Sequence, residues 1–422
     1  MARQSHLFVA AEVAPANIAA LKDLLASMTA APGEADPANA IVPFGRIDGL
    51  HVARFVLLED PSLPDRIGVT DLPPVEPTRL ALLADGDGSP DEIVDRFAAV
   101  AAEGLARLFG HCDPTLDPAT IAAWMRRHRI VPAATYVNWP GRDARQVREE
   151  AGLHAALLAV RLAHPEAPLD VLGPLLREAA RATPLTPLAK PRIAERIGDA
   201  AHFLLLPVLA LVLAPVLILA MPVLIPMLRT RETEDPVIAP RPAPARNRML
   251  SEIEDRDVAN QYSAIGTVKT GLFRLWLTIA ILWIINWGAR HLYRSGRLGR
   301  VNTIHFASWV FLDDKRRVVF ASNYDGSREA YNDDFINKVA FGLNLSFSNG
   351  LGYPRTNWLI FGGARHEQDF KWYLFHHQIP TQVWYNAFRG LTTYDMARNA
   401  RLRAAIERGP EGEALRRLVA EI

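Results

Sequence analysis

The side chains best suited to carry chemistry lie beyond residue 300. Carboxylates and imidazoles exchange protons near neutral pH, and imidazoles also ligate metals and cofactors. Amides, indoles and phenols next to them can orient a bound molecule. Six residues are therefore catalytic candidates: His305, Asn323, Asp325, Trp384, Tyr385 and Asn386. Three more are candidates for binding a cofactor: His376, His377 and Arg355.

None of the common catalytic motifs accompanies these residues. The sequence has no HExxH, HxxEH or CxxC spacing, so we predict no dedicated metal site. It also lacks GxSxG and GxxxxGK[ST], which argues against the common hydrolase and P-loop nucleotide classes. Its single cysteine, Cys112, excludes an intramolecular disulfide framework. With 47 Lys and Arg against 46 Asp and Glu, no global basic field exists to hold a nucleic acid.

An internal repeat organises most of the chain. Residues 50–60 (LHVARFVLLED) match residues 304–314 (IHFASWVFLDD), and each block is an alternating strand that ends in two acids. Residues 78–97 match 316–335, where a strand, an Asp-Gly-Ser turn and a helix follow one another. The match continues along the helices, where Gly104 corresponds to Gly342. Several blocks in one order indicate a duplication.

Each copy also has an earlier strand, at His6–Val13 and at Gln261–Val268. The order of elements is then strand, helix, strand, strand, helix, strand. This βαββαβ order resembles the ferredoxin-like fold and, as a duplicate, the dimeric α+β-barrel superfamily. The fold class that we predict is α+β, with two tandem ferredoxin-like repeats and an apolar, proline-broken membrane insert between them. The resemblance implies that the two sheets pair into a sandwich or barrel.

The Asp-Gly-Ser turns allow two interpretations. In the first, Ser89-Pro90-Asp91-Glu92 is a capping box and both turns only start helices. In the second, Asn323 and Asp325 face a cavity. The segment Asn323-Tyr324-Asp325-Gly326 is similar to the Gly-x-x-Asp-Gly segment of dye-decolorising peroxidases, although Ser322 stands where their first glycine belongs. This similarity implies a possible haem, with an axial ligand from His305, His376 or His377.

The two copies differ in their chemical content. Where the first has Ala84-Asp85-Gly86, the second has Ser322-Asn323-Tyr324. If the duplication left one half as scaffold, a functional site lies in the second half. The alternative is that these polar groups form a hydrogen-bonded network that ties the sheet to its loops.

Two apolar segments indicate contact with a membrane. Residues 203–228 carry no charge over 26 positions but contain four prolines, and residues 272–288 are rich in tryptophan and are followed by arginines. Because the flanking strands of the second segment must share a sheet, its helix is expected to lie along the interface. The prolines favour a re-entrant or shallow hairpin at 203–228, hence monotopic attachment. The alternatives are a two-span transmembrane hairpin with residues 229–270 outside, and buried core helices in a soluble protein.

These expectations divide the chain into six parts: a first repeat at 1–163, a proline-rich connector at 164–202, the apolar segment at 203–228, a proline-rich linker at 229–258, a second repeat at 259–408 with an interfacial helix at 271–293, and a C-terminal tail at 409–422.

Two functions fit these expectations. One is a membrane-associated enzyme, such as a haem-dependent, peroxidase-like oxidoreductase acting on a lipophilic substrate. The other is a non-catalytic accessory protein that binds membrane lipid, docks a partner protein or forms a homo-oligomer. The expected location is the cytoplasmic face of a bacterial inner membrane.

Overall fold

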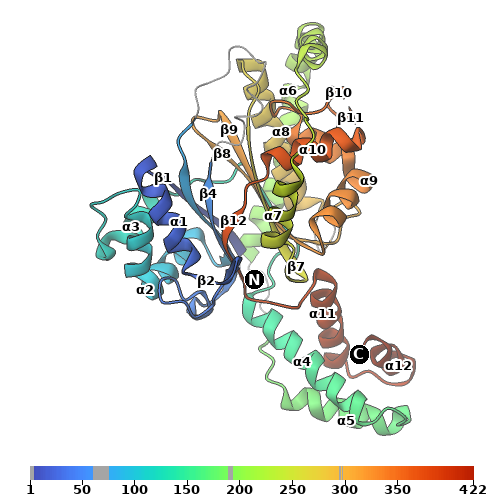
Figure 1. Cartoon of the computed structure of the whole chain (residues 1–422). Helices are drawn as coiled ribbons and strands as arrows, with labels where there is room; N and C mark the ends of the chain where they lie inside the picture. Colours follow the sequence, from blue (N-terminus) through green and yellow to red (C-terminus); the bar gives the residue numbers. More distant parts are fainter. Residues whose placement is uncertain (1–3, 60–75, 189–192, 294–295, 297) are drawn as a thin grey trace.

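The chain is a mixed α/β protein built on two β-sheets, with a long apolar helix between the sheet regions (Figure 1). This computed structural model describes residues 4–59, 76–188, 193–293, 296 and 298–422. The first sheet has the order β1-β5-β4-β12-β3-β2, and the second has the order β6-β8-β9-β7. The strands of the first sheet are β1 (Gln4–Glu12), β2 (Thr29–Ala31), β3 (Gly33–Ala35), β4 (Leu50–Leu58), β5 (Arg79–Asp87) and β12 (Thr381–Asn386). Those of the second are β6 (Ala134–Val137), β7 (Ala259–Thr267), β8 (Ile304–Leu312) and β9 (Arg317–Asp325).

One strand of each half lies in the sheet of the other half. Strand β6 pairs antiparallel with β8, and β12 pairs antiparallel with β4. Just before each of these strands, the chain still contacts its own half: the Ile130 amide donates to the Phe8 carbonyl at 2.8 Å, and the Ile379 amide donates to the Ser263 carbonyl at 2.9 Å. These crossing segments join the sheets at both edges. The two halves are therefore interlocked, with an apolar cluster between the sheets that includes Val56 and Val319.

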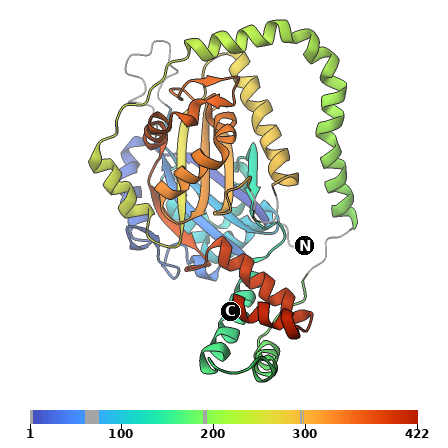
Figure 2. The same ribbon diagram turned by 90° about the vertical axis from the view of Figure 1, so that its right-hand side faces the viewer.

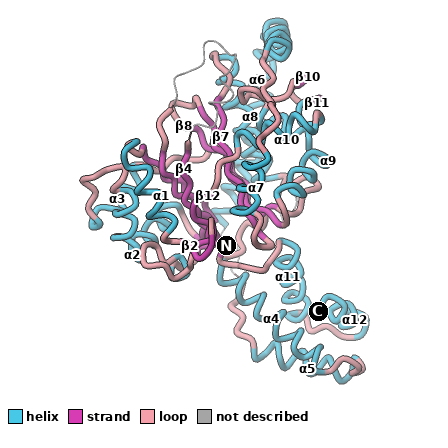
Figure 3. Tube along the Cα trace, viewed as in Figure 1, coloured by secondary structure: helices cyan, strands magenta, loops and turns pink. Residues whose placement is uncertain are grey.

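Helices cover the outer face of each sheet, as Figures 1 and 3 show. The first sheet packs against α1 (Ile18–Ala26), α2 (Pro90–Phe109) and α3 (Ile121–Arg127) in the largest core cluster. The second packs against α8 (Leu272–His291) and α9 (Arg328–Phe347), and α9 in turn packs against α10 (Glu367–His377). Helices α2 and α9 each have one residue with non-helical backbone angles, Ala101 and Val339, at the twelfth position of the helix.

A separate group of four helices packs on one side of the sheets (Figure 2). It consists of α4 (Ala144–Ala163), α5 (Leu169–Ala182), α11 (Thr393–Glu407) and α12 (Gly412–Glu421), joined by a leucine-rich core. The segment predicted as a C-terminal tail thus contains a helix, whose Leu415 and Leu418 are buried. The short strands β10 (Thr356–Asn357) and β11 (Phe361–Gly362) form a small hairpin near α6.

The apolar segment is one bent helix, α6 (Ile193–Glu234), which arches away from the rest of the chain (Figure 2). It contains all four prolines and extends beyond the predicted 203–228 on both sides. The expected re-entrant hairpin is not formed. A proline removes one backbone hydrogen bond and bends a helix, but the turns between successive prolines keep theirs. The helix continues for this reason.

Both ends of α6 are attached to the folded body. At its start, the ring of Phe203 stacks on Trp287 of α8 with centroids 5.5 Å apart. At its end, the buried Glu232 carboxylate accepts hydrogen bonds from the amides of Trp358 and Leu359 at 3.0 and 2.8 Å. Beyond the helix, α7 (Pro244–Glu254) leads into β7. Because β7 lies in the second sheet, the chain after α6 returns directly to the folded body. The two-span alternative does not allow this, since it places residues 229–270 on the outer side of the membrane.

Two helices of the described residues, α6 and α8, are long and apolar enough to cross a membrane by length and composition. They differ in burial: the apolar window of α6 is entirely unburied, whereas that of α8 is 39% buried. Along α8 the outward side chains are apolar too, with Leu272 and Trp276 largely exposed. An exposed apolar helix of this length suggests membrane association.

Candidate functional site

The predicted acid Asp325 and His305 form a pair that anchors a helix. The Nε2 of His305 lies 2.6 Å from one carboxylate oxygen of Asp325. The other oxygen accepts the backbone amide of Thr393, the first residue of α11, at 2.8 Å. A carboxylate at a helix N-terminus is stabilised by the unpaired amides and the helix dipole. Both oxygens of Asp325 are thus engaged, one by His305 within the sheet and the other by the start of α11.

The first half contains the same arrangement. His51 Nε2 lies 2.8 Å from one oxygen of Asp87, and the other oxygen accepts the amide of Ala144 at 2.9 Å. Ala144 is the first residue of α4. The first half makes the same His–Asp–helix contact although it has fewer polar side chains at the positions that match the candidate site. We therefore interpret this contact as structural in both halves.

Asn323 and Trp384 belong to a second group, centred on Arg54. This arginine projects from β4 between the sheets and is only 3% exposed. Its guanidinium donates to the Tyr262 carbonyl at 2.8 Å, to the Ser322 carbonyl at 2.9 Å and to the side-chain oxygen of Asn323. It also lies 4.9 Å from the ring centroid of Trp384, in cation–π contact.

Acidic side chains complete the Arg54 group. Asp85 pairs with His6 and accepts a 3.4 Å hydrogen bond from Asn323. Burial lowers the pKa of Arg54 to about 10, while the nearby Asp85 and Glu254 oppose this shift. The space around the group is only about 10 Å³, room for at most about one water molecule. The Arg54 group therefore ties the two sheets together and leaves no room for a substrate.

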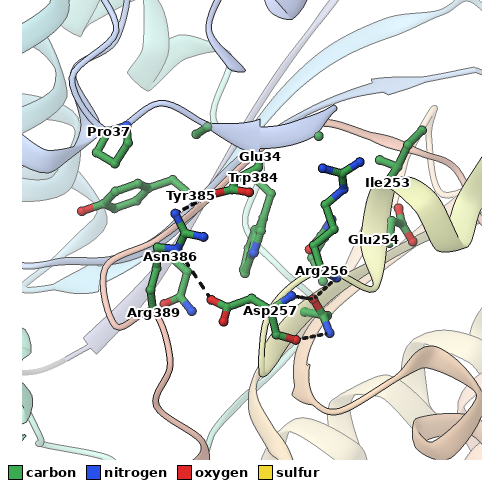
Figure 4. A pocket seen from close by; sticks show the side chains of 14 residues that line it. Glu34, Pro37, Ile253, Glu254, Arg256, Asp257, Trp384, Tyr385, Asn386 and Arg389 are labelled. Atoms are coloured by element: carbon green, nitrogen blue, oxygen red, sulfur yellow. Dashed lines mark hydrogen bonds and ion pairs between the residues drawn. The ribbon is translucent and has the colours of Figure 1, made fainter. Parts of the chain in front are cut away.

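Trp384, Tyr385 and Asn386 also contribute to a small pocket between the halves (Figure 4). Its other walls come from β3 of the first half and from α7 and β7. Tyr385 points to the opposite side of β12, as strand alternation predicts, and stacks on Phe44 with centroids 5.2 Å apart. The side-chain oxygen of Asn386 accepts the amide of Phe388 at 2.9 Å. A volume of about 30 Å³ limits the pocket to roughly two water molecules.

The pocket ends on a buried acid, Glu254 at the end of α7. Its carboxyl accepts hydrogen bonds from the side-chain amide of Gln378 and from the Thr381 amide, the latter at 3.2 Å. Burial raises the pKa of Glu254 to about 8, and these hydrogen bonds and Arg328 only partly oppose the shift. Glu254 thus holds its proton at neutral pH.

We expect Glu254→Gln to remove a pH dependence of stability. The wild-type carboxyl has a pKa of about 8 when folded and its ordinary pKa of 4.5 when unfolded. The folded state therefore binds more protons between these values, so its free energy of unfolding falls as pH rises through about 8. The amide is the isostere of the protonated acid, and the variant should gain on the order of 4 kcal/mol over wild type above pH 8.

Chemical denaturation from pH 5 to 9 measures this difference. Glu252→Gln is the matched control, because Glu252 is exposed on the same helix. Parallel pH profiles for wild type and both variants would contradict the assignment.

The three candidate cofactor ligands do not converge. Arg355 is exposed, and its carbonyl accepts the Gly363 amide at 2.8 Å. His376 Nε2 lies 2.6 Å from the Pro240 carbonyl, while His377 Nδ1 lies 2.8 Å from the Tyr373 carbonyl. His305, the remaining imidazole, is engaged by Asp325. Among the described residues, no three His, Cys, Asp or Glu side chains are placed to hold a metal ion. These side chains do not fit a haem site.

A partly open space in the second half is apolar instead. A cavity of about 240 Å³ lies between α8, α9 and the outer face of the second sheet. Its floor includes Trp309 and Phe320, and its walls include Ile285 and Val339. Leu206 of α6 lines it as well, so the exposed apolar helix runs past the edge of the cavity. An apolar cavity of about 150 Å³ is known to hold benzene, so this one has room for a larger apolar molecule.

A glycine comparison shows why the space beside α9 is open. In α2, a Cβ on Gly104 would lie 1.8 Å from the Ile41 carbonyl oxygen, because the loop before β4 packs directly on this helix. At Gly342 of α9, the position that the repeat pairs with Gly104, a Cβ would meet nothing within 4 Å. None of the described residues fills the space beside Gly342 in this way. Gly342 lines the resulting space.

Sequence reasoning missed Arg54 and the cavity. The signal for Arg54 was a lone charge within the apolar strand LHVARFVLL, which requires buried partners. The repeat pairs Gly104 with Gly342, but the sequence does not show whether the space beside each glycine is filled.

Comparison with known proteins gives no assignment, because no family model, curated protein or solved structure matches this chain.

Proposed function

We propose that this chain is a membrane-associated protein that binds one lipophilic molecule in the cavity between α8, α9 and the second sheet. The observation that carries the proposal is the adjacency of this cavity to α6. An apolar space of about 240 Å³ has Leu206 in its wall, and the helix that follows Leu206 exposes its apolar side chains. A ligand dissolved in the bilayer has a short apolar path into the protein.

Monotopic attachment accounts best for the interlocked halves. A bilayer between them would separate β6 from β8 and β12 from β4, which pair in the structure. Both halves must therefore lie on one side of the membrane, with α6 in its interfacial layer. Arginines at the ends of α6 and α8, such as Arg229 and Arg290, support the cytoplasmic leaflet as the side. We also propose that the halves descend from two ferredoxin-like repeats that exchanged their last strands.

A binding role is favoured over a peroxidase-like enzyme. The groups that an oxidoreductase would use are engaged elsewhere: Asp325 holds α11, and Asn323 accepts from Arg54. Among the described residues, no histidine lines the apolar cavity. The space is suited to an apolar ligand but supplies no pair of groups for acid–base chemistry.

Photolabelling with a neutral hydrophobic diazirine in membranes tests the proposal. The label reaches every surface that meets lipid, so α6 peptides serve as an internal reference. We expect additional labelling of cavity residues, chiefly Ile285 and the stretch from Phe335 to Ser346, that saturates at one label per chain. Labelling confined to α6 and to the exposed side chains of α8 would contradict a cavity that binds a ligand.

A further inference from the structure

The tip of the β10–β11 hairpin presents apolar side chains to solvent. Between the two strands the chain reads Trp358-Leu359-Ile360, and Phe361 follows as the first residue of β11. Trp358 is 47% exposed and Phe361 is 52% exposed, and Ile360 is exposed as well. Single apolar side chains are common on protein surfaces, but a run of them at an exposed turn indicates a partner.

The backbone of this tip is held in an uncommon conformation. Trp358 and Leu359 have φ values of 57° and 61°, in the left-handed region that bulky residues seldom adopt. The buried Glu232 carboxylate at the end of α6 accepts hydrogen bonds from both of their amides and, at 2.9 Å, from the Thr356 hydroxyl. Arg229 pairs with the same carboxylate and lies 5.0 Å from the ring centroid of Trp358. Such a conformation persists only where the surroundings impose it, and here the end of α6 does so.

Other exposed apolar side chains lie at the same end of the molecule (Figures 1 and 2). Near its end α6 exposes Met227, and the first turns of α8 expose Leu272 and Trp276. A largely buried ion pair fixes the two helices to each other, because Asp235, just after α6, pairs with Arg274 of α8. The hairpin tip is therefore held next to the two helices that are long and apolar enough to meet a membrane.

A lipid bilayer fits this surface better than a protein partner does. The apolar window of α6 is entirely unburied, and a helix that is apolar on every face needs an apolar environment all around it. A bilayer supplies that environment for α6 and meets the neighbouring hairpin at the same time. Trp358 next to Arg229 also suits the membrane–water interface, where indoles lie at the headgroups and arginine side chains extend toward water.

We propose that the tip of the β10–β11 hairpin is a further membrane anchor, which inserts into the interfacial layer of the bilayer beside α6. The proposal rests on the membrane association in the proposed function, but not on the cavity or its ligand. Glu232 is its positioning residue, because it holds the tip in the conformation in which these side chains are exposed.

A fluorophore that reports membrane depth tests the insertion on the full-length chain. Cys112→Ala removes the single native thiol, and Ile360→Cys then places a nitrobenzoxadiazole label at the tip. In liposomes of phosphatidylcholine and phosphatidylglycerol, we expect this label to be quenched by doxyl groups on the lipid acyl chains. A label at Leu219→Cys, 81% exposed on α6, is the membrane reference. A label at Arg417→Cys on α12, at the opposite end of the molecule, should not be quenched (Figure 1).

The reference label separates this proposal from the proposed function. A tip label that stays unquenched while the α6 label is quenched would overturn the hairpin anchor and leave the attachment through α6 intact. If the α6 label is not quenched either, the membrane association itself fails.

Glu232→Gln tests the positioning role. Glutamine has one acceptor oxygen and a donor NH2 group, so one of the two tip amides loses its acceptor. We expect quenching of the tip label to fall while quenching of the α6 label is retained. The matched control is Glu234→Gln, exposed on the same helix, which should leave both labels as in the parent protein. Undiminished quenching of the tip label in Glu232→Gln would overturn the role assigned to Glu232.

Discussion

Replacing Arg54 with methionine should destabilise the protein by about 3–5 kcal/mol, the largest effect on stability that we expect from a single substitution. The guanidinium is the shared donor for acceptors on two strands of the opposite sheet, Tyr262 and Ser263 on β7 and Ser322 and Asn323 on β9. Methionine fills similar space but leaves those acceptors without a protein donor, in a site with room for at most about one water molecule. It also removes the cation beside Asp85.

Denaturant unfolding of the solubilised protein measures this loss. The exposed Arg107 on α2 supplies the control, and Arg107→Met should stay within about 0.5 kcal/mol of wild type. If Arg54→Met unfolded at the same denaturant concentration as Arg107→Met, the Arg54 group would not be what ties the sheets together.

The second large effect is on binding. Gly342→Leu should reduce cavity labelling by about tenfold or more, because the new side chain occupies space that the ligand needs and overpacking costs about 1–3 kcal/mol. Gly342 shares one helical face with the lining residues Phe335, Val339 and Ser346, so the leucine projects into the cavity. No neighbouring atom lies within 4 Å of the added Cβ, so the folded protein accepts the change.

Stability and binding move in opposite directions in this variant, which makes the result easy to interpret. Leucine is a better helix former than glycine by about 0.8 kcal/mol, so Gly342→Leu should unfold no earlier than wild type. Gly152→Leu on α4 carries the same propensity gain, with open space around its Cβ and no contact with the cavity. Its labelling should match wild type. Undiminished labelling of Gly342→Leu at Ile285 and Phe335 would place the ligand elsewhere.

Local patterns predicted the strands and helices well, because hydrophobic alternation and capping are local properties. Strands were expected at 50–60 and 304–314 and lie at Leu50–Leu58 and Ile304–Leu312. The capping box at Ser89 is formed, and Ser327 caps α9 through its side chain. The pairing of β6 with β8 could not be read from the sequence. A strand of alternating residues fits either sheet, and only the tertiary path of the chain decides between them.

The site was harder to predict than the fold, for physical reasons that individual residues illustrate. Asp325 has the residue type of a catalyst, but the amide of Thr393, 68 positions later, determines its role. Arg54 was overlooked because its partners belong to strands more than 200 positions away. At Gly104 the space is filled by Ile41, 63 positions earlier, whereas no described atom lies within 4 Å of a Cβ at Gly342, and this difference cannot be read from the sequence.

Native mass spectrometry of the protein released from its own membranes tests the central claim most directly. The wild type and Gly152→Leu should each retain one lipophilic molecule per chain, whereas Gly342→Leu prepared in parallel should be released without it. Wild-type protein that carries no such molecule, or one retained equally by Gly342→Leu, would contradict the account.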